Sequence, residues 1–364
     1  VCDHCFLVQL GEYVAPDDIF GTYYHYFSSF SDSWLDHAKA YTEAMIARLG
    51  LDTSSQVVEI ASNDGYLLQY FLERGVPAYG IEPAANVAEA ARAKGIDTVV
   101  EFFGTRCAER LAKQRGRPDL LLGNNVLAHV PDVNDFVSGM ARLLAPGGTI
   151  TMEFPHLMRL VAESQFDTIY HEHFSYFSFS TVERIFAHHG LTLVDVEELP
   201  THGGSLRIFA QHAETPPAKP SQRVAELKAR EQAAGMLSLP YYRDFSAKAA
   251  RIRRNLMRFL FDANEAGESV VGYGAPGKGN TLLNYCGIRA DLLAYTVDRS
   301  PAKQGTFLPG SRIPVYGPEL IDETQPDYVL IMPWNLKEEI MAQMSHIRDW
   351  GGRFVTAIPK LTIT

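Results

Sequence analysis

The stretch that most constrains the fold is VVEIASNDGYLLQYF, residues 57–71. It begins with a β-branched apolar run, Val57–Ile60, of the kind that a strand buried on both faces of a parallel sheet requires. A short polar turn ending at Gly65 follows, and apolar side chains then recur at helical spacing up to Phe71. A strand, a glycine-containing turn and a helix in this order predict the first βα corner of a doubly wound sheet, where a helix N-terminus attracts an anion.

This turn is not a dinucleotide-binding G-x-G-x-x-G, because Gly65 is its only glycine. It resembles the E-x-G-x-x-x-G first motif of methyltransferases that use S-adenosylmethionine, with Glu59 as the acid and Ala61 in place of the first glycine. A second predicted strand ends at Glu82, 23 positions after Glu59, where a carboxylate can bind both ribose hydroxyls of a nucleoside. The alternative is a purely structural βαβ unit of another α/β enzyme.

Seven segments between residues 56 and 211 are predicted to form strands. They are residues 56–61, 77–82, 98–103, 119–126, 148–154, 191–199 and 205–211. Helical patterns separate the first six, whereas the last two follow each other closely. This order predicts a parallel sheet closed by an antiparallel hairpin, which is typical of a Rossmann-type methyltransferase and not of dehydrogenases.

The second half of the chain contains another glycine corner. Prolines 216, 217 and 220 mark a linker, and helical spacing continues to residue 267. A strand then leads into GYGAPGKGN, which contains a true G-x-G-x-x-G at Gly272, Gly274 and Gly277, with Lys278 and Asn280 behind it. We expect a smaller Rossmann-like α/β domain whose loop cradles a diphosphate, the alternative being a glycine turn used only for packing.

Length, charge and cysteine content narrow the class of protein. The 364 residues suffice for two or three domains, and the net charge of −10 argues against nucleic acid as a partner. No apolar run reaches membrane-span length and no signal peptide is recognisable, so we expect no membrane partner. Four cysteines form no disulfide framework and favour a reducing, cytoplasmic setting. Cys2 and Cys5 have the spacing of half a zinc site, and from the residues alone metal-bound and metal-free states are equally open.

Polar and aromatic residues follow three predicted strands, at the sheet edge where a ligand is expected. After the third strand, Phe102 and Phe103 can flank an adenine or simply pack in the core. Asn125 ends the fourth strand, and His129 follows it.

A dense cluster of reactive side chains occupies residues 166–177, FDTIYHEHFSYF. Tyr170, Glu172 and His173 offer a phenol for an oxyanion, an orienting carboxylate and a general base. His171 and His173 could instead bind a metal together with His129 or His202, or could cap helices. The density of the cluster favours a catalytic site.

Taken together, these segments resemble the sugar C-methyltransferases that act on nucleotide-linked 4-keto-deoxysugars, a group that includes the C-3 methyltransferase of tetronitrose biosynthesis. The motifs that carry the resemblance run through the whole chain. In order, they are Cys2-x-x-Cys5, Tyr24-x-Tyr26-x-Ser28-Ser29, Asn63-Asp64-Gly65, Glu82-Pro83, Phe102-Phe103, Asn125-x-Leu127-x-His129, Tyr170-x-Glu172-His173-Phe174, His202-Gly203-Gly204 and Gly272-Tyr273-Gly274-x-x-Gly277-Lys278-Gly279.

The resemblance implies a domain order and a set of roles. Residues 1–50 would be the remnant of a zinc module with a helical lead-in, with Cys2 and Cys5 as one half of a four-cysteine structural zinc site. Residues 51–214 would bind S-adenosylmethionine, residues 215–267 would connect, and residues 268–364 would help to hold the nucleotide sugar. Ala61 and His171 depart from the family pattern.

The site residues follow from the motif match together with the chemistry. Those expected to be catalytic are His173, Glu172, Tyr170 and His129. Those expected to bind the cofactor are Ala61, Asn63, Asp64, Gly65, Glu82, Pro83, Phe102, Phe103 and Asn125. Those expected to bind the substrate are Tyr24, Tyr26, His202, Gly203, Gly204, Arg207, Gly274, Gly277, Lys278 and Asn280. The alternatives are a non-catalytic binder of a nucleotide sugar and an NAD-dependent dehydrogenase that uses the C-terminal glycine loop.

Overall fold

The computed structural model describes residues 1–21, 24, 26–214 and 219–364. These residues form two compact units. Unit 1 comprises residues 1–157, 171–200 and 204–238, and unit 2 comprises residues 158–170, 201–203 and 239–364. The domain boundaries expected after residues 50, 214 and 267 remain predictions, because compactness does not show where a chain folds independently. Pro216 and Pro217 of the expected linker lie outside the described residues.

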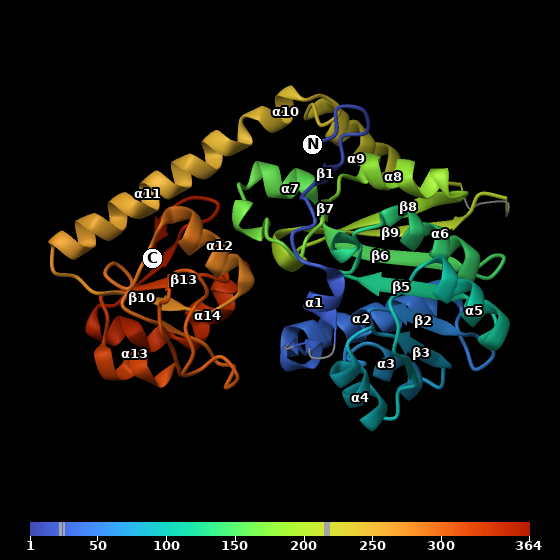
Figure 1. Cartoon of the computed structure of the whole chain (residues 1–364), viewed down its shortest axis with the longest axis horizontal. Helices are drawn as coiled ribbons and strands as arrows, with labels where there is room; N and C mark the ends of the chain where they lie inside the picture. The colour runs from blue at the N-terminus through green and yellow to red at the C-terminus, as the bar shows by residue number, and fades with distance from the viewer. Residues whose placement is uncertain (22–23, 25, 215–218) are drawn as a thin grey trace. The chain divides into compact units, whose positions relative to one another are not determined.

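Unit 1 contains a seven-stranded sheet in the order β4-β3-β2-β5-β6-β9-β8 (Figure 1). Its strands are β2 (Val57–Ile60), β3 (Ala78–Ile81), β4 (Thr98–Val99), β5 (Leu120–Asn124), β6 (Thr149–Pro155), β8 (Leu191–Leu199) and β9 (Ser205–His212). Neighbouring strands are parallel except that β9 runs antiparallel to both β6 and β8. All seven predicted strands and the closing hairpin are therefore confirmed, although β4 ends at Val99 instead of residue 103.

Both faces of this sheet are buried, which explains the continuous apolar runs of its strands. In β2, Val58 and Ile60 face a core shared with α5, α6 and α8, whereas Val57 faces a core shared with α2 and α3. The helices on the first face are α5 (Thr105–Arg115), α6 (Val133–Leu143) and α8 (Phe179–His188); those on the second are α2 (Asp32–Leu49) and α3 (Leu68–Glu73). Successive apolar side chains of a strand point to opposite faces of the sheet, so helices pack on both faces of unit 1.

Unit 2 contains a second, smaller sheet in the order β12-β11-β10-β13-β14-β15. Its strands are β10 (Val270–Tyr273), β11 (Thr296–Val297), β12 (Val315–Tyr316), β13 (Tyr328–Ile331), β14 (Arg353–Thr356) and β15 (Thr362–Ile363). Only β15 is antiparallel. The helices α11 (Phe245–Glu265) and α12 (Gly277–Cys286) cover one face, and α13 (Glu319–Thr324) and α14 (Lys337–Gln343) cover the other. The expected Rossmann-like architecture is present in unit 2.

The shorter elements complete the two units. They are β1 (Val8–Gln9), which pairs with β7 (Ser175–Tyr176), and the helices α1 (Pro16–Phe20), α4 (Ala85–Ala93), α7 (Leu157–Ala162), α9 (Gln222–Ala233) and α10 (Pro240–Arg243). Among the described residues, no helix has both the length and the apolar character needed to cross a bilayer.

Candidate active site

The loop after β2 has the backbone geometry of an anion-binding turn. Ala61, Asn63 and Gly65 alternate along it with positive φ values of 55°, 50° and 76°. A Cβ at residue 65 would lie 2.2 Å from Cδ1 of Ile96, so both the backbone conformation and the packing require glycine here. Ala61, which replaces the first glycine of the motif, adopts the left-handed backbone conformation that a glycine would adopt more easily, and this costs some backbone strain.

Glu82 lies directly after β3, beside this loop. Its carboxylate accepts the backbone N–H of Asn63 at 3.0 Å and that of Ala84 at 2.9 Å. Burial raises the pKa of Glu82 to about 7, although these two N–H groups oppose the shift. The structure therefore presents a rigidly held, buried carboxylate at the strand end where a ribose is expected.

The side chain of Asn63 binds a segment from far upstream. We call residues 24–29 the strap; its residue 25 is outside the described part of the chain. Oδ1 of Asn63 accepts the backbone N–H of Ser28 at 2.8 Å, and Nδ2 donates to the carbonyl of Tyr26 at 3.2 Å. Asp64 accepts a hydrogen bond from Ser29 Oγ and pairs with Lys94 at 2.9 Å. The strap is thus bound to the predicted cofactor loop.

The two phenylalanines after β4 have different environments. Phe102 is exposed, whereas the Phe103 ring packs against Phe136 at a centroid distance of 5.3 Å. Glu101 pairs with Arg110 instead of pointing to the loop. Phe102 therefore has the freer ring for an adenine, and the role of both residues stays a prediction.

Two of the predicted catalytic residues meet in unit 1. The rings of His129 and His173 lie 4.7 Å apart, almost perpendicular to each other. Burial lowers the pKa of His129 to about 4, against an opposing hydrogen bond with the Glu172 backbone. Phe20 contacts the His129 ring at 5.5 Å, and Tyr176 lies 6.0 Å from the His173 ring. His129 is therefore a neutral imidazole at neutral pH, beside a second histidine.

Glu172 lies next to this pair in sequence and is half-buried. Burial raises the pKa of its carboxyl group, while the neighbouring His171 partly opposes the shift. A carboxylate whose charge is disfavoured by its surroundings can orient an imidazole and stabilise it once it is protonated.

A buried carboxylate fixes the loop that carries His173. Glu231 on α9 accepts the backbone N–H groups of Phe179 at 2.6 Å and Ser180 at 2.9 Å, at the start of α8. The same carboxylate also accepts a hydrogen bond from Ser180 Oγ at 2.6 Å and lies 2.8 Å from Nε2 of His156. Because α8 begins five residues after Phe174, these hydrogen bonds restrict the positions available to residues 171–173.

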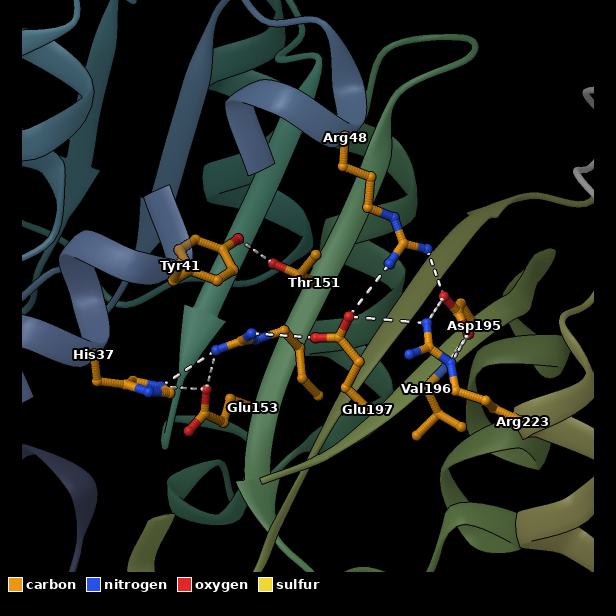
Figure 2. A network of polar contacts seen from close by, with 10 residues as sticks. His37, Tyr41, Arg48, Thr151, Glu153, Asp195, Val196, Glu197 and Arg223 are labelled. Carbon is orange, nitrogen blue, oxygen red and sulfur yellow. Dashed lines mark hydrogen bonds and ion pairs between the residues drawn. The ribbon is translucent and has the colours of Figure 1, made fainter. Parts of the chain in front are cut away.

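Arg207 is buried in a polar network, and Figure 2 labels its partners Glu153 and Glu197. Its guanidinium binds Glu153 at 2.9 Å and Glu197 at 3.3 Å, and Nε2 of His37 also contacts Glu153 at 2.9 Å. Figure 2 shows the network continuing through Glu197 to Arg48 and on to Asp195. The predicted role of Arg207 as a substrate ligand stays a prediction, since both of its amino groups already have protein partners.

Unit 2 assembles a different group of predicted residues around the glycine corner. Nζ of Lys278 donates to Oδ1 of Asn335 at 2.7 Å and lies 4.7 Å from the centre of the Trp334 ring. Nε1 of Trp334 in turn donates to the buried carboxylate of Asp167 at 2.7 Å. Burial lowers the pKa of Lys278, with the charge of Asp167 opposing the shift. Lys278 is thus a partly buried cation.

The other predicted residues of unit 2 lie near this group. Gly274 has a φ of +89°, and a Cβ there would approach Cδ of Pro333 to 2.6 Å. A Cβ at Gly277 would lie 3.9 Å from Cζ of Tyr170. His202 has a φ of 53°, and a Cβ at Gly203 would lie 2.5 Å from Trp334. Close packing within unit 2 therefore requires glycine at residues 203 and 274, whereas the contact at Gly277 is an ordinary van der Waals distance.

The structure therefore divides the predicted residues between the two units. Unit 1 contains Tyr24, Tyr26, Ala61, Asn63, Asp64, Gly65, Glu82, Pro83, Phe102, Phe103, Asn125, His129, Glu172, His173, Gly204 and Arg207. Unit 2 contains Tyr170, His202, Gly203, Gly274, Gly277, Lys278 and Asn280. Sequence reasoning missed Phe20, Asn86, Tyr176 and Asp167. Only Asn86 had a local signal, an amide in the first turn of an otherwise alanine-rich helix after Glu82-Pro83.

The cysteine pair does not form a complete metal site. The backbone N–H of Cys5, followed by that of His4, lowers the pKa of Cys2. Within the described residues, no three His, Cys, Asp or Glu side chains gather as metal ligands, at the histidine pair or elsewhere. Two thiolates supply half of a tetrahedral zinc site. The zinc module stays a prediction.

The comparisons with known proteins agree with this architecture. The model of the C-methyltransferase C-terminal domain family matches residues 200–359, and the model of a methyltransferase domain family matches residues 34–196. C-methyltransferase NovU of Streptomyces niveus is 37% identical over 99% of this chain and 85% of its own length. Ubiquinone biosynthesis O-methyltransferase of Bordetella avium is 29% identical over 26% of this chain and 40% of its own.

Solved structures show weaker similarity. Magnesium protoporphyrin IX methyltransferase of Synechocystis, with bound S-adenosylhomocysteine, shares 15% identity over 48% of this chain and 81% of its own, with a TM-score of 0.38. A similarity at that level supports no functional argument.

The loop after β2, the held carboxylate of Glu82 and the exposed ring of Phe102 fit S-adenosylmethionine, with its ribose and its adenine. The sequence identity with NovU covers 99% of this chain, so the relationship includes both units. It also removes the dehydrogenase alternative, which left the first corner unexplained. The chain therefore belongs to the C-methyltransferase family that includes NovU, and it is an S-adenosylmethionine-dependent C-methyltransferase.

Proposed function

We propose that the enzyme removes the proton from the carbon next to the ketone of a nucleotide-linked 4-keto-deoxysugar and methylates that carbon, C-3. The observation that carries this proposal is the His129–His173 pair, which lies in the same unit as the cofactor corner. Phe20 contacts both His129 and Tyr24 of the strap, and the strap is bound to the cofactor loop. A candidate base and the methyl-donor corner are thus joined by one set of contacts.

The chemistry explains why a histidine is needed. A saturated sugar carbon is no nucleophile, but a carbon next to a ketone becomes one when its proton is removed. In this proposal the C–H bond breaks, the proton goes to the imidazole of His173, and the electron pair enters the enolate. Tyr170 donates a hydrogen bond to the enolate oxygen, or neutral His129 does so once its single N–H leaves the backbone carbonyl of Glu172, and Glu172 orients the base.

Bound S-adenosylmethionine supplies an electrophilic methyl group on a sulfonium. Glu82 would bind its ribose, Phe102 and Phe103 its adenine, and Asn125 its methionine portion. The loop residues Ala61, Asn63, Asp64 and Gly65, together with Pro83, would shape the corner around it.

Unit 2 would hold the substrate's nucleotide part. We propose that Gly274, Gly277, Lys278 and Asn280 bind the diphosphate, supported by the strand–loop–helix corner and by the partly buried ammonium of Lys278. Tyr24, Tyr26, His202, Gly203, Gly204 and Arg207 would complete the sugar site. A cytoplasmic location belongs to the same proposal and is supported by four free cysteines.

Proton exchange tests the base directly. The enzyme is incubated in deuterium oxide with a panel of nucleotide 4-ketosugars and no methyl donor, and exchange next to the ketone is followed by NMR. Wild type should exchange this proton. His173→Asn should lose both exchange and methylation by roughly 10²–10⁴-fold, the usual contribution of a general base.

The exposed neighbour His171 provides the matched control. His171→Asn should retain exchange and methylation, and both variants should bind S-adenosylmethionine as wild type does. Near-normal exchange by His173→Asn would identify another base, with His171 the first to examine. Absence of exchange with every 4-ketosugar would contradict the substrate class.

A further inference from the structure

Asn86, in the first turn of α4, binds the backbone of a residue 62 positions upstream. Its Oδ1 accepts the backbone N–H of Tyr24 at 2.9 Å, and its Nδ2 donates to the carbonyl of Tyr24 at 2.9 Å. One amide side chain thus satisfies both backbone polar groups of Tyr24, as a neighbouring strand would.

Asn63 also binds the backbone of the strap with both ends of its amide. It accepts the N–H of Ser28 and donates to the carbonyl of Tyr26. The two asparagines come from opposite sides of Glu82: one from the loop after β2, the other from the helix after β3. The strap is therefore anchored at two points, and Glu82, the predicted ribose carboxylate, itself holds the backbone of one of them, Asn63.

Ring contacts lead from the Asn86 anchor to the histidine pair. Tyr24 lies 5.4 Å from the ring of Phe20, which lies 5.5 Å from His129, which lies 4.7 Å from His173. Every residue of this path belongs to unit 1. The position of the Tyr24 ring against Phe20 follows the position of the Tyr24 backbone, because only two side-chain torsions connect the ring to its Cα.

We propose that Asn86 is a positioning residue of the methyl-transfer site: it holds the Tyr24 backbone so that the Tyr24 ring stays against Phe20 beside the histidine pair. The effect on turnover rests on the proposed function, in which Tyr24 contacts the sugar. The effect on the strap does not, since it concerns contacts within unit 1 alone.

The test combines hydrogen exchange with kinetics on the full chain. Asn86→Ala should increase deuterium uptake in peptides covering the strap and lower kcat about tenfold, the scale of one to two lost hydrogen bonds. The Kd for S-adenosylhomocysteine should stay within about threefold, since both side-chain hydrogen bonds that Asn86 makes with described residues go to the strap. Asn86→Asp keeps the acceptor for the Tyr24 N–H and loses the donor to its carbonyl, so it should be intermediate in both measurements.

A double variant separates positioning from general damage. If Asn86 acts through Tyr24, Asn86→Ala should cost nothing further in a Tyr24→Ala background. Asn134→Ala is the matched control: Asn134 is an exposed asparagine in the first turn of α6, with its Oδ1 near His189, and its loss should change neither measurement. Additive losses, or unchanged uptake in the strap of Asn86→Ala, would overturn the proposal. If wild type turns over no 4-ketosugar while uptake changes as expected, the proposed function fails and the positioning of the strap stands.

Discussion

The chain has two strand–loop–helix corners, one in each unit, and an acid holds the loop in both. In unit 1, Glu82 after β3 accepts the loop N–H of Asn63 at 3.0 Å. In unit 2, Asp298 after β11 accepts the loop N–H of Ala275 at 2.7 Å. The two corners therefore share the acid-to-loop hydrogen bond as well as the βα topology.

They differ in what surrounds the acid and the loop. Asp298 pairs with Lys303 at 3.2 Å, whereas no lysine or arginine of the described chain forms an ion pair with buried Glu82. The loop of unit 1 is bound by the strap, while the loop of unit 2 is followed by Lys278, which turns to Asn335 inside its own unit.

This difference shows how little a glycine motif decides by itself. At the corner with the true G-x-G-x-x-G the acid, Asp298, pairs with Lys303, whereas the acid at the corner with a single glycine, Glu82, is buried and has no ion-pair partner among the described residues. The two corners therefore differ in charge and burial in a way that their glycines do not indicate.

The largest expected contrast between the corners is the pH dependence of stability due to Glu82. Burial raises its pKa to about 7 in the folded state, above its value in the unfolded chain. The stability that this group contributes is therefore present at low pH and is lost as the pH rises through 7. The free energy of unfolding of wild type, relative to that of Glu82→Gln, should fall by about 2–3 kcal/mol between pH 5 and pH 8.

Urea unfolding at several pH values measures this difference. Asp298→Asn provides the control, because its carboxylate has a lysine partner, and its difference from wild type should vary less over the same range. If the difference in unfolding free energy from wild type varied equally with pH for Glu82→Gln and for Asp298→Asn, the two corners would not differ in how their acids are neutralised.

The next contrast is in cofactor binding. Glu82→Ala should weaken binding of S-adenosylmethionine by roughly 1.5–3 kcal/mol, because a charged acceptor of hydrogen bonds is lost. Asp298→Ala should leave the affinity within about twofold, since its corner is assigned to the nucleotide sugar. Calorimetry distinguishes the two variants, and an unchanged affinity of Glu82→Ala would refute the ribose assignment.

The smallest contrast concerns Lys278 and the substrate. Lys278→Met should raise KM for the nucleotide sugar about tenfold, the scale of one charge-assisted hydrogen bond, and should leave cofactor affinity unchanged. Lys303→Met removes a more exposed cation of the same unit and serves as the control. Steady-state kinetics at saturating cofactor measures both, and a KM of Lys278→Met equal to that of the control would contradict the diphosphate assignment.

Much of the fold was predictable because it rests on local patterns. Apolar runs at strand spacing located all seven strands of the first sheet, and the Pro-Thr-His-Gly-Gly turn located its hairpin. The exception is β4, which was predicted to reach residue 103. The chain turns away after Val99, and Phe103 packs on Phe136 from outside the sheet. From the sequence, an apolar residue at the end of a strand can either continue the strand pairing or only pack its side chain against the core.

The candidate site was predictable as a list of residues but not as an arrangement. The sequence alone predicts a cofactor corner, a histidine cluster and a second glycine loop, because strands, turns and family motifs are contiguous in the chain. Only the tertiary structure brought His129 to His173, removed Arg207 into an ion-pair network and placed Asn86 on the backbone of Tyr24. The His129–His173, Arg207–Glu153 and Asn86–Tyr24 contacts join residues 44 or more positions apart, and nothing in the local spacing of side chains encodes such distances. Burial decided the rest, since a neutral His129 and a protonatable Glu82 depend on the solvent that the whole fold excludes.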